Sequence, residues 1–116
     1  MRIHNLFEDE AGVSHFRDVE LRWEDVRGAS ELTRKYPAAG IIMRETTKDY
    51  DAGRHPAPRR QYIIILDAGV NITAGDGETR YIGPGEAVMV EDPEGKGEIS
   101  KFVADAMRHS TVLAVE

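Results

Sequence analysis

The sequence contains no cysteine and no long hydrophobic run. Without cysteine the chain can form no disulfide, no thiolate nucleophile and no zinc–thiolate site, and it is compatible with a reducing compartment. No segment approaches the roughly 20 apolar residues that a membrane span requires. Residues 1–11 are rich in charged side chains and lack the apolar core of a secretory signal. We therefore expect a soluble, cytoplasmic protein with no membrane partner.

Positive charge is also scarce. The 21 acidic residues outnumber the 15 lysines and arginines, which gives a formal net charge of −6. Such a charge repels a phosphate backbone unless the basic residues form a dense cluster. They gather only weakly, at Arg54, Arg59 and Arg60, so nucleic acid is disfavoured as a partner.

The remaining composition is that of one globular domain. A chain of 116 residues, 41% of them hydrophobic, can bury roughly two thirds of its unfolded surface. Neither a linker nor an internal repeat divides it. We expect a single domain over residues 1–116, with edge strands and a loop in residues 1–39 and a barrel core in residues 40–116.

Short apolar segments separated by turn signals begin at Gly40. The Gly-Asp-Gly sequence at residues 75–77 predicts a tight hairpin, and Gly-Pro-Gly at residues 83–85 predicts another turn. Strands that recur about every eight to twelve residues, without a helical period, favour an antiparallel sandwich or barrel. The predicted strands are residues 41–46, 61–66, 70–74, 79–82, 87–91, 99–104 and 111–115.

The N-terminal part of the chain is less regular. Val19, Leu21 and Trp23 alternate with charged residues, which is the pattern of a half-buried edge strand. Further on, Ser30 could cap one short helical turn that Pro37 ends. A plain loop explains the same residues equally well, and both interpretations remain open.

The segment Arg54–Gly69 brings polar residues to the start of a buried strand. Side chains alternate along a strand, so a core-facing Gln61 shares its face with Ile63 and Ile65. Proline cannot donate a ladder hydrogen bond, and the two prolines that follow His55 therefore belong at a sheet edge or barrel rim. We expect His55 near a mouth of the barrel.

Two groups of residues between positions 40 and 104 have a recognisable spacing. The first group is Gly53, His55, Ala57, Gln61 and Ala68, and the second is Gly77, Pro84, Gly85 and Glu98. This spacing resembles the two sequence motifs of small single-domain cupins. The resemblance implies an all-β double-stranded β-helix, or jelly-roll barrel, of antiparallel strands with at most one short helical turn. It also implies a homodimer, because cupins often pair through N-terminal strands.

The resemblance also bears on metal binding, since the usual cupin site takes three imidazoles and one carboxylate. At the matching positions only His55 keeps its imidazole; Ala57 has no donor atom, Gln61 offers an amide oxygen and Glu98 a carboxylate. We therefore favour no cofactor. The alternative is a divalent metal (Mn, Fe, Ni or Zn) at low occupancy on His55, Gln61 and Glu98, with a water or Glu45 completing the shell.

If the motifs align as above, His55, Gln61 and Glu98 converge inside the barrel. Burial raises the pKa of a carboxyl and an adjacent imidazolium lowers it, so Glu98 could serve as general acid or base, assisted by His55. The predicted function is metal-independent isomerisation, cyclisation or elimination of an organic substrate. A metal-dependent enzyme, a non-catalytic ligand-binding or sensor module, and a static hydrogen-bond network remain alternatives.

Substrate binding is expected from Gln61 and from Arg59 or Arg60, which directly precede the central strand. A guanidinium there could bind a carboxylate or enolate oxygen in a forked geometry. The alternative for each arginine is a surface salt bridge to one of the 21 acids. Met43 and Glu45, on the strand at residues 41–46, complete the set of predicted binding residues.

Three other histidines have no partner at ligand spacing in the sequence, namely His4, His15 and His109. His109 is followed by Ser110, but this pair forms no triad without a placed acid. We expect all three at the surface or at the rim of the barrel.

Overall fold

The computed structural model describes residues 1–47, 60–91 and 101–115, and every regular element within these ranges is a β-strand. The strands are β1 (Arg2–Glu8), β2 (Ser14–Glu20), β3 (Asp25–Arg27), β4 (Ser30–Leu32), β5 (Gly40–Thr46), β6 (Gln61–Ile65), β7 (Val70–Thr73), β8 (Thr79–Ile82), β9 (Ala87–Glu91), β10 (Lys101–Val103) and β11 (Arg108–Ala114). The predicted all-β class is confirmed.

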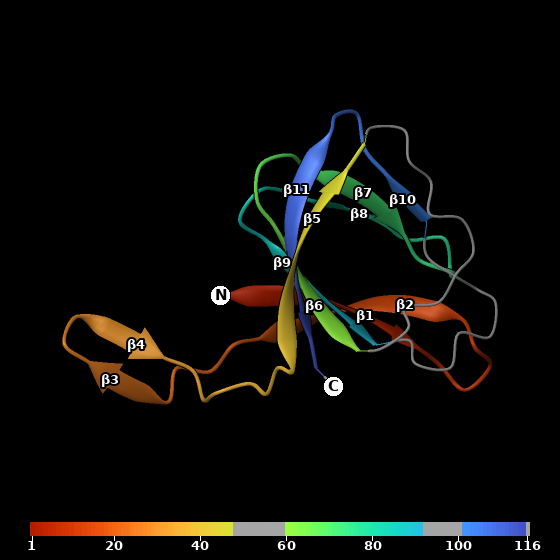
Figure 1. Ribbon diagram of the computed structural model, residues 1–116. Helices are drawn as coiled ribbons and strands as arrows, with labels where there is room; N and C mark the ends of the chain where they lie inside the picture. Colours follow the sequence, from red (N-terminus) through yellow and green to blue (C-terminus); the bar gives the residue numbers. More distant parts are fainter. Residues whose placement is uncertain (48–59, 92–100, 116) are drawn as a thin grey trace.

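Two sheets form the body of the molecule, in a jelly-roll-like arrangement (Figure 1). The larger has the strand order β2-β1-β9-β6-β11-β5, and the smaller has the order β10-β7-β8. Neighbouring strands are antiparallel, as predicted, with one exception: β1 pairs with β9 in parallel, with Leu6 opposite Val90. The larger sheet thereby joins strands from both ends of the described chain.

The hydrophobic core lies between these sheets. Ile63 and Ile65 of β6 are almost completely buried, and Ile72 and Ile82 from the smaller sheet have no exposed surface at all. Burying each such side chain contributes roughly 1.5–3 kcal/mol. The alternation of inward and outward side chains along each strand therefore decides which residues can reach a site inside the barrel.

The strands predicted beyond Gly40 agree closely with β5 to β11. The two turns predicted from glycine and proline are also present. Gly77 has φ of 96° and Gly85 has φ of 84°, a backbone conformation that glycine adopts without the steric penalty of a Cβ atom. The last strand begins at Arg108, three residues earlier than predicted, and this brings Arg108 into the sheet.

The N-terminal strands differ from the prediction. The strand expected around Val19–Trp23 ends at Glu20, and where a helical turn or loop was expected, β4 forms a hairpin with β3 that projects from the body (Figure 1). The first strand, β1, was not predicted and is no edge strand, because it lies between β2 and β9. Four consecutive residues of β1 are buried, so it lacks the alternation that marks a half-buried strand.

Candidate functional site

The predicted catalytic residues fall outside the described part of the chain. His55 and Arg59 lie within residues 48–59, and Glu98 lies within residues 92–100. Gln61 is described, and it sits on the core-facing side of β6 with Ile63 and Ile65, as predicted. The convergence of Gln61 with His55 and Glu98 stays a prediction.

Arg60 forms the salt bridge that was the alternative to substrate binding. Its Nη2 atom lies 2.5 Å from Oε1 of Glu91. Glu91 also accepts a hydrogen bond of 3.0 Å from the side-chain amide of Asn5, and it lies 3.6 Å from Nη2 of Arg17. Arg60 thus belongs to a surface ion-pair cluster, and its expected role in substrate binding is not supported.

Met43 and Glu45 face away from the barrel interior. Met43 pairs with Thr111 across the strands and is 69% exposed, and Glu45 pairs with His109 on the same outer face. The reason for this outward position is the period of two along β5, which turns the intervening Arg44 inward. Both residues line a groove on the outer face, and their role in ligand binding stays a prediction.

Three polar residues missed in the sequence occupy the inner face where β5 meets β11. Arg44 lies opposite Ser110, and its Nε atom donates a 3.2 Å hydrogen bond to Oγ of Ser110. Arg108 lies two residues along β11 on the same face and is only 3% exposed. In the described part of the chain, the Nη1 atom of Arg108 is buried without a hydrogen-bond partner. We call Arg44, Ser110 and Arg108 the arginine site.

Arg108 carries positive charge into a buried position. Burial lowers the pKa of Arg108, and the nearby charge of Arg44 lowers it further. An arginine nevertheless keeps its proton in proteins. Arg44 and Arg108 are diagonal neighbours across the β5–β11 pair, an arrangement that separates Cα atoms by about 7–8 Å.

Gln61 lies at the opposite end of the inner face from the arginine site. It pairs with Ala114, six residues along β11 from Arg108, which at the rise of a strand corresponds to roughly 20 Å. The structure therefore brings Arg44, Ser110 and Arg108 together, but it does not bring Gln61 to them.

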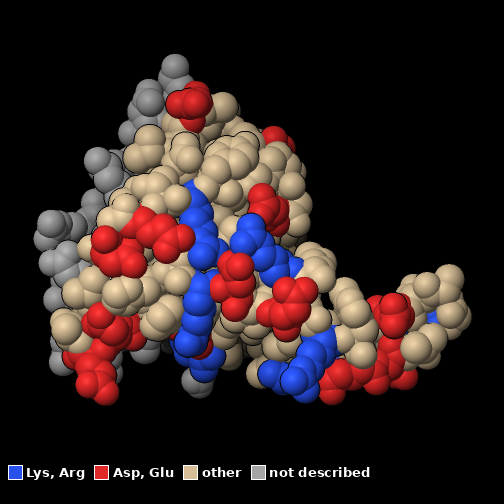
Figure 2. Space-filling model, turned by 180° about the vertical axis from the view of Figure 1, so that it is seen from behind, with Lys and Arg blue, Asp and Glu red and all other residues tan. Residues whose placement is uncertain are grey.

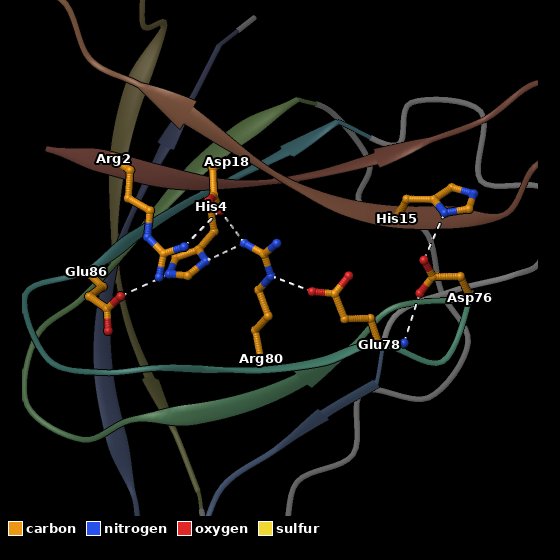
Figure 3. Close-up of polar contacts among 8 residues, drawn as sticks. All are labelled: Arg2, His4, His15, Asp18, Asp76, Glu78, Arg80 and Glu86. Atoms are coloured by element: carbon orange, nitrogen blue, oxygen red, sulfur yellow. Dashed lines mark hydrogen bonds and ion pairs between the residues drawn. The ribbon is translucent and has the colours of Figure 1, made fainter.

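A second polar constellation surrounds the buried His4 of β1 (Figure 3). Its Nδ1 atom lies 3.2 Å from Nη1 of Arg80, and its Nε2 atom lies 2.9 Å from Oε1 of Glu86. Arg80 can only donate, so Nδ1 must accept and Nε2–H donates to Glu86. His4 is buried and not at the surface, which corrects the expectation from sequence.

The His4 constellation links the two sheets through paired charges. Arg80 of β8 donates to Asp18 of β2 at 2.6 Å and to Glu78 at 2.8 Å, and Arg2 of β1 donates to the same Asp18 oxygen at 2.9 Å (Figure 3). These bonds, Arg80 first, lower the pKa of Asp18. On the face drawn in Figure 2, basic side chains accordingly form a narrow band with acidic side chains on both sides. We assign this constellation a structural role.

His109 lies on the outer face of β11, between two carboxylates. Its Nδ1 atom is 2.5 Å from Oδ2 of Asp67, and its Nε2 atom is 2.9 Å from Oε2 of Glu45. The Asp67 hydrogen bond, and then that of Glu45, raises the pKa of His109. The three side chains border an open groove of about 470 Å³. The groove is lined by Met43, Arg44, Glu45, Leu66, Asp67, His109 and Ser110.

His15 is a similar case at the tip of the β1–β2 hairpin. Its Nε2 atom lies 2.6 Å from Asp9 and its Nδ1 atom lies 2.9 Å from Asp76, and these bonds raise its pKa, that of Asp9 first. His15 and His109 are both partly exposed. The expectation of surface or rim positions is confirmed for these two histidines.

The residues that the structure describes do not fit a metal site. They contain no group of three or more histidine, aspartate or glutamate residues placed to hold an ion. Of the alternative metal ligands, Gln61 and Glu45 are described. Gln61 supplies a neutral amide oxygen on the inner face, and Glu45 lies on the outer face against His109. We therefore derive no step through a metal. In the same described ranges, no helix is long and apolar enough to cross a membrane.

Comparison with known proteins informs the fold. No family model and no curated protein matches the sequence. A conserved protein of unknown function from Streptococcus pyogenes is similar, with a TM-score of 0.52 and 23% sequence identity, over 72% of this chain and 69% of that chain. The polyketide cyclase RemF from Streptomyces resistomycificus aligns with a TM-score of 0.48 and 20% identity, over 71% of this chain and 69% of that chain. The first similarity supports the fold alone, and from the second we draw no conclusion.

Proposed function

We propose that the protein binds a small organic molecule against the inner face of its larger sheet, where β5 meets β11. One observation carries this proposal. The inner face that presents the apolar Ile65 and Val112 also carries three polar residues, Arg44, Ser110 and Arg108. Ligand sites in proteins combine a mostly apolar lining with a few convergent polar groups. A core that served packing alone would not require three polar side chains at this place.

Adjacent residues of β11 offer a matched test. Ser110 faces inward and Thr111 faces outward, and both are buried. Ser110→Ala removes a hydroxyl from the proposed site, so we expect affinity for a ligand to fall about 5- to 10-fold, the value of one hydrogen bond. Thr111→Val removes a hydroxyl from the outer face and should leave affinity unchanged.

The measurement is a thermal-shift screen of small organic acids and neutral aromatic compounds, followed by calorimetric titration of the compounds that bind. Equal affinity of both variants for every such compound would contradict the position of the site. Failure of every compound to bind the wild-type protein would contradict the proposal itself.

We further propose that the protein catalyses proton transfer, as in an isomerisation, cyclisation or elimination, at the Gln61 end of the inner face and not at the arginine site. Its support is the cupin-like spacing of the sequence, which would bring Glu98 and His55 together with Gln61 inside the barrel. There we expect Glu98 to act as acid or base and His55 to assist it. Glu98→Gln keeps the shape of the side chain and removes the base. We expect turnover of a bound substrate to fall about 10²- to 10⁴-fold with little change in Kd. Unchanged turnover would exclude Glu98, and an effect on Kd alone would favour a non-catalytic binding module.

A further inference from the structure

We propose that the ligand carries an anionic oxygen group, a carboxylate or a phosphate, and that this group binds the guanidinium of Arg108 beside Arg44. This inference rests on the proposed function, because it names the chemical class of the ligand at the same site. It also makes a claim about the ligand-free protein, which can be tested separately.

Arg108 is the residue on which the inference depends. It is 3% exposed, and its Nη1 atom is buried with no hydrogen-bond partner within residues 1–47, 60–91 and 101–115. A buried polar group without a partner costs free energy, and a buried charge without a counter-charge costs more. The ligand-free protein therefore holds an unfavourable group at this place, which an anion would compensate by a charge-assisted hydrogen bond.

The protein cannot relieve this cost by releasing a proton. A guanidinium stays protonated even when burial lowers its pKa. Repulsion by the charge of Arg44 adds to the unfavourable effect of burial on Arg108. On the same face, the neighbouring strand presents the apolar Ile65 opposite Ser110. The open Nη1 donor of Arg108 thus lies beside a second guanidinium and a hydroxyl, a positively charged surrounding that suits a small anion.

The ion pairs of Arg80, another arginine that faces the interior, provide a contrast. Arg80 has carboxylate partners in Asp18 at 2.6 Å and Glu78 at 2.8 Å. Arg60 likewise forms an ion pair with Glu91. By contrast, Nη1 of the more deeply buried Arg108 has no hydrogen-bond partner among the residues that the structure describes. An arginine that serves packing or sheet contacts is expected to be paired as Arg80 is, whereas one that binds a ligand leaves a donor open.

Arg108→Met is the first test, and it needs no ligand. Methionine keeps an unbranched apolar stem and removes the unpaired charge, so we expect the ligand-free protein to become more stable, with Tm higher by roughly 3–8 °C. Arg80→Met is the matched control, because it leaves Asp18 and Glu78 without their partner and should lower Tm. A lower Tm for Arg108→Met would overturn the inference.

Ligand binding is the second test. Benzoate, phenylacetate and cinnamate are each compared with the corresponding amide, which has the same shape and no charge, and phenyl phosphate is included as the other anion class. We expect at least one of these anions to bind the wild-type protein while its neutral counterpart does not. Arg108→Met should weaken that binding about 10- to 100-fold, and Arg108→Lys should weaken it less. Arg27→Met, in the projecting β3–β4 hairpin, should leave it unchanged.

The outcomes separate the two proposals. Equal binding of acids and amides, unaffected by Arg108→Met but weakened by Ser110→Ala, would overturn the anionic class and leave the proposed function standing. Binding of neither acids nor amides would overturn both. Preference for phenyl phosphate or for the carboxylates would support the inference in either case and would identify which anion the site takes.

Discussion

The ion pair of His109 with Asp67 makes stability depend on pH in a defined direction. The raised pKa of His109 favours the folded state below its ordinary value of 6.5, and this contribution is lost as the pH rises through the folded-state pKa. The lowered pKa of Asp67, caused first by the backbone N–H of His109, favours the folded state above 3.8, and its contribution is lost as the pH falls. The pair therefore stabilises the fold between these two values.

Asp67→Asn should return the pKa of His109 toward its ordinary value, because the first cause of the shift is the hydrogen bond to Asp67. Titration of the imidazole signals by NMR measures this directly. Glu45→Gln removes the second partner and should cause a smaller change. The pKa of His15 should be unaffected in both variants, since its partners are Asp9 and Asp76. A His109 pKa that did not move in Asp67→Asn would refute the assignment.

At the scale of single residues, the sequence predicted orientation better than role. The inward position of Gln61 followed from the period of β6. The same period holds on β5, but hydrophobicity does not mark its inward face, because the exposed Met43 is apolar and the inward Arg44 is charged. A hydrophobic pattern cannot reveal a buried arginine, since burial of charge contradicts the rule from which the pattern is read.

The first strand, β1, is an interior element of the larger sheet, and its core contacts can be tested. Leu6 is 2% exposed and packs in the core cluster. Leu6→Ala should lower the free energy of unfolding by about 2–5 kcal/mol, through lost burial and the cavity that remains. Urea denaturation followed by circular dichroism measures the change.

Val26 in the projecting hairpin is the control for Leu6. It is 66% exposed, and Val26→Ala should change the free energy of unfolding by less than about 0.5 kcal/mol. If Leu6→Ala were equally mild, β1 would contribute little to the core and the sheet order would have to be revised.

Among the elements, prediction succeeded where glycine and proline mark the turns between strands. β6 to β9 follow one another through such turns, and their limits were predicted closely. β1 could not be predicted from alternation, because Ile3 and Asn5 are buried on one face while His4 and Leu6 are buried on the other. Its parallel pairing with β9 is a contact between distant parts of the chain, which no local signal encodes.

For the whole molecule, the homodimer expected from the cupin resemblance stays a prediction, and β5 offers a place for it. This strand ends the larger sheet, and Ile41, Ile42 and Met43 on it are all exposed. An uncovered edge strand presents unpaired backbone groups that can pair with a second copy. We expect a concentration-dependent dimer in sedimentation experiments.

Charge on this edge should prevent the association. The double variant Ile41→Lys and Met43→Lys places two ammonium groups on the outer face of β5 and should sediment as a monomer. Glu10→Lys, an exposed turn residue, is the control and should behave as the wild-type protein does. A wild-type protein that stays monomeric at every concentration tested would disprove the dimer.

The position of β11 also constrains the order in which the molecule can fold. This strand is the last of those described, and it lies between β6 and β5, pairing with both. During synthesis, β5 and β6 therefore cannot complete their ladders until residues 108–114 have emerged. Contacts of such large sequence separation slow folding, because loop closure must precede any gain from pairing. Until then the nascent chain leaves β5 and one edge of β6 unpaired, and unpaired strand edges favour aggregation.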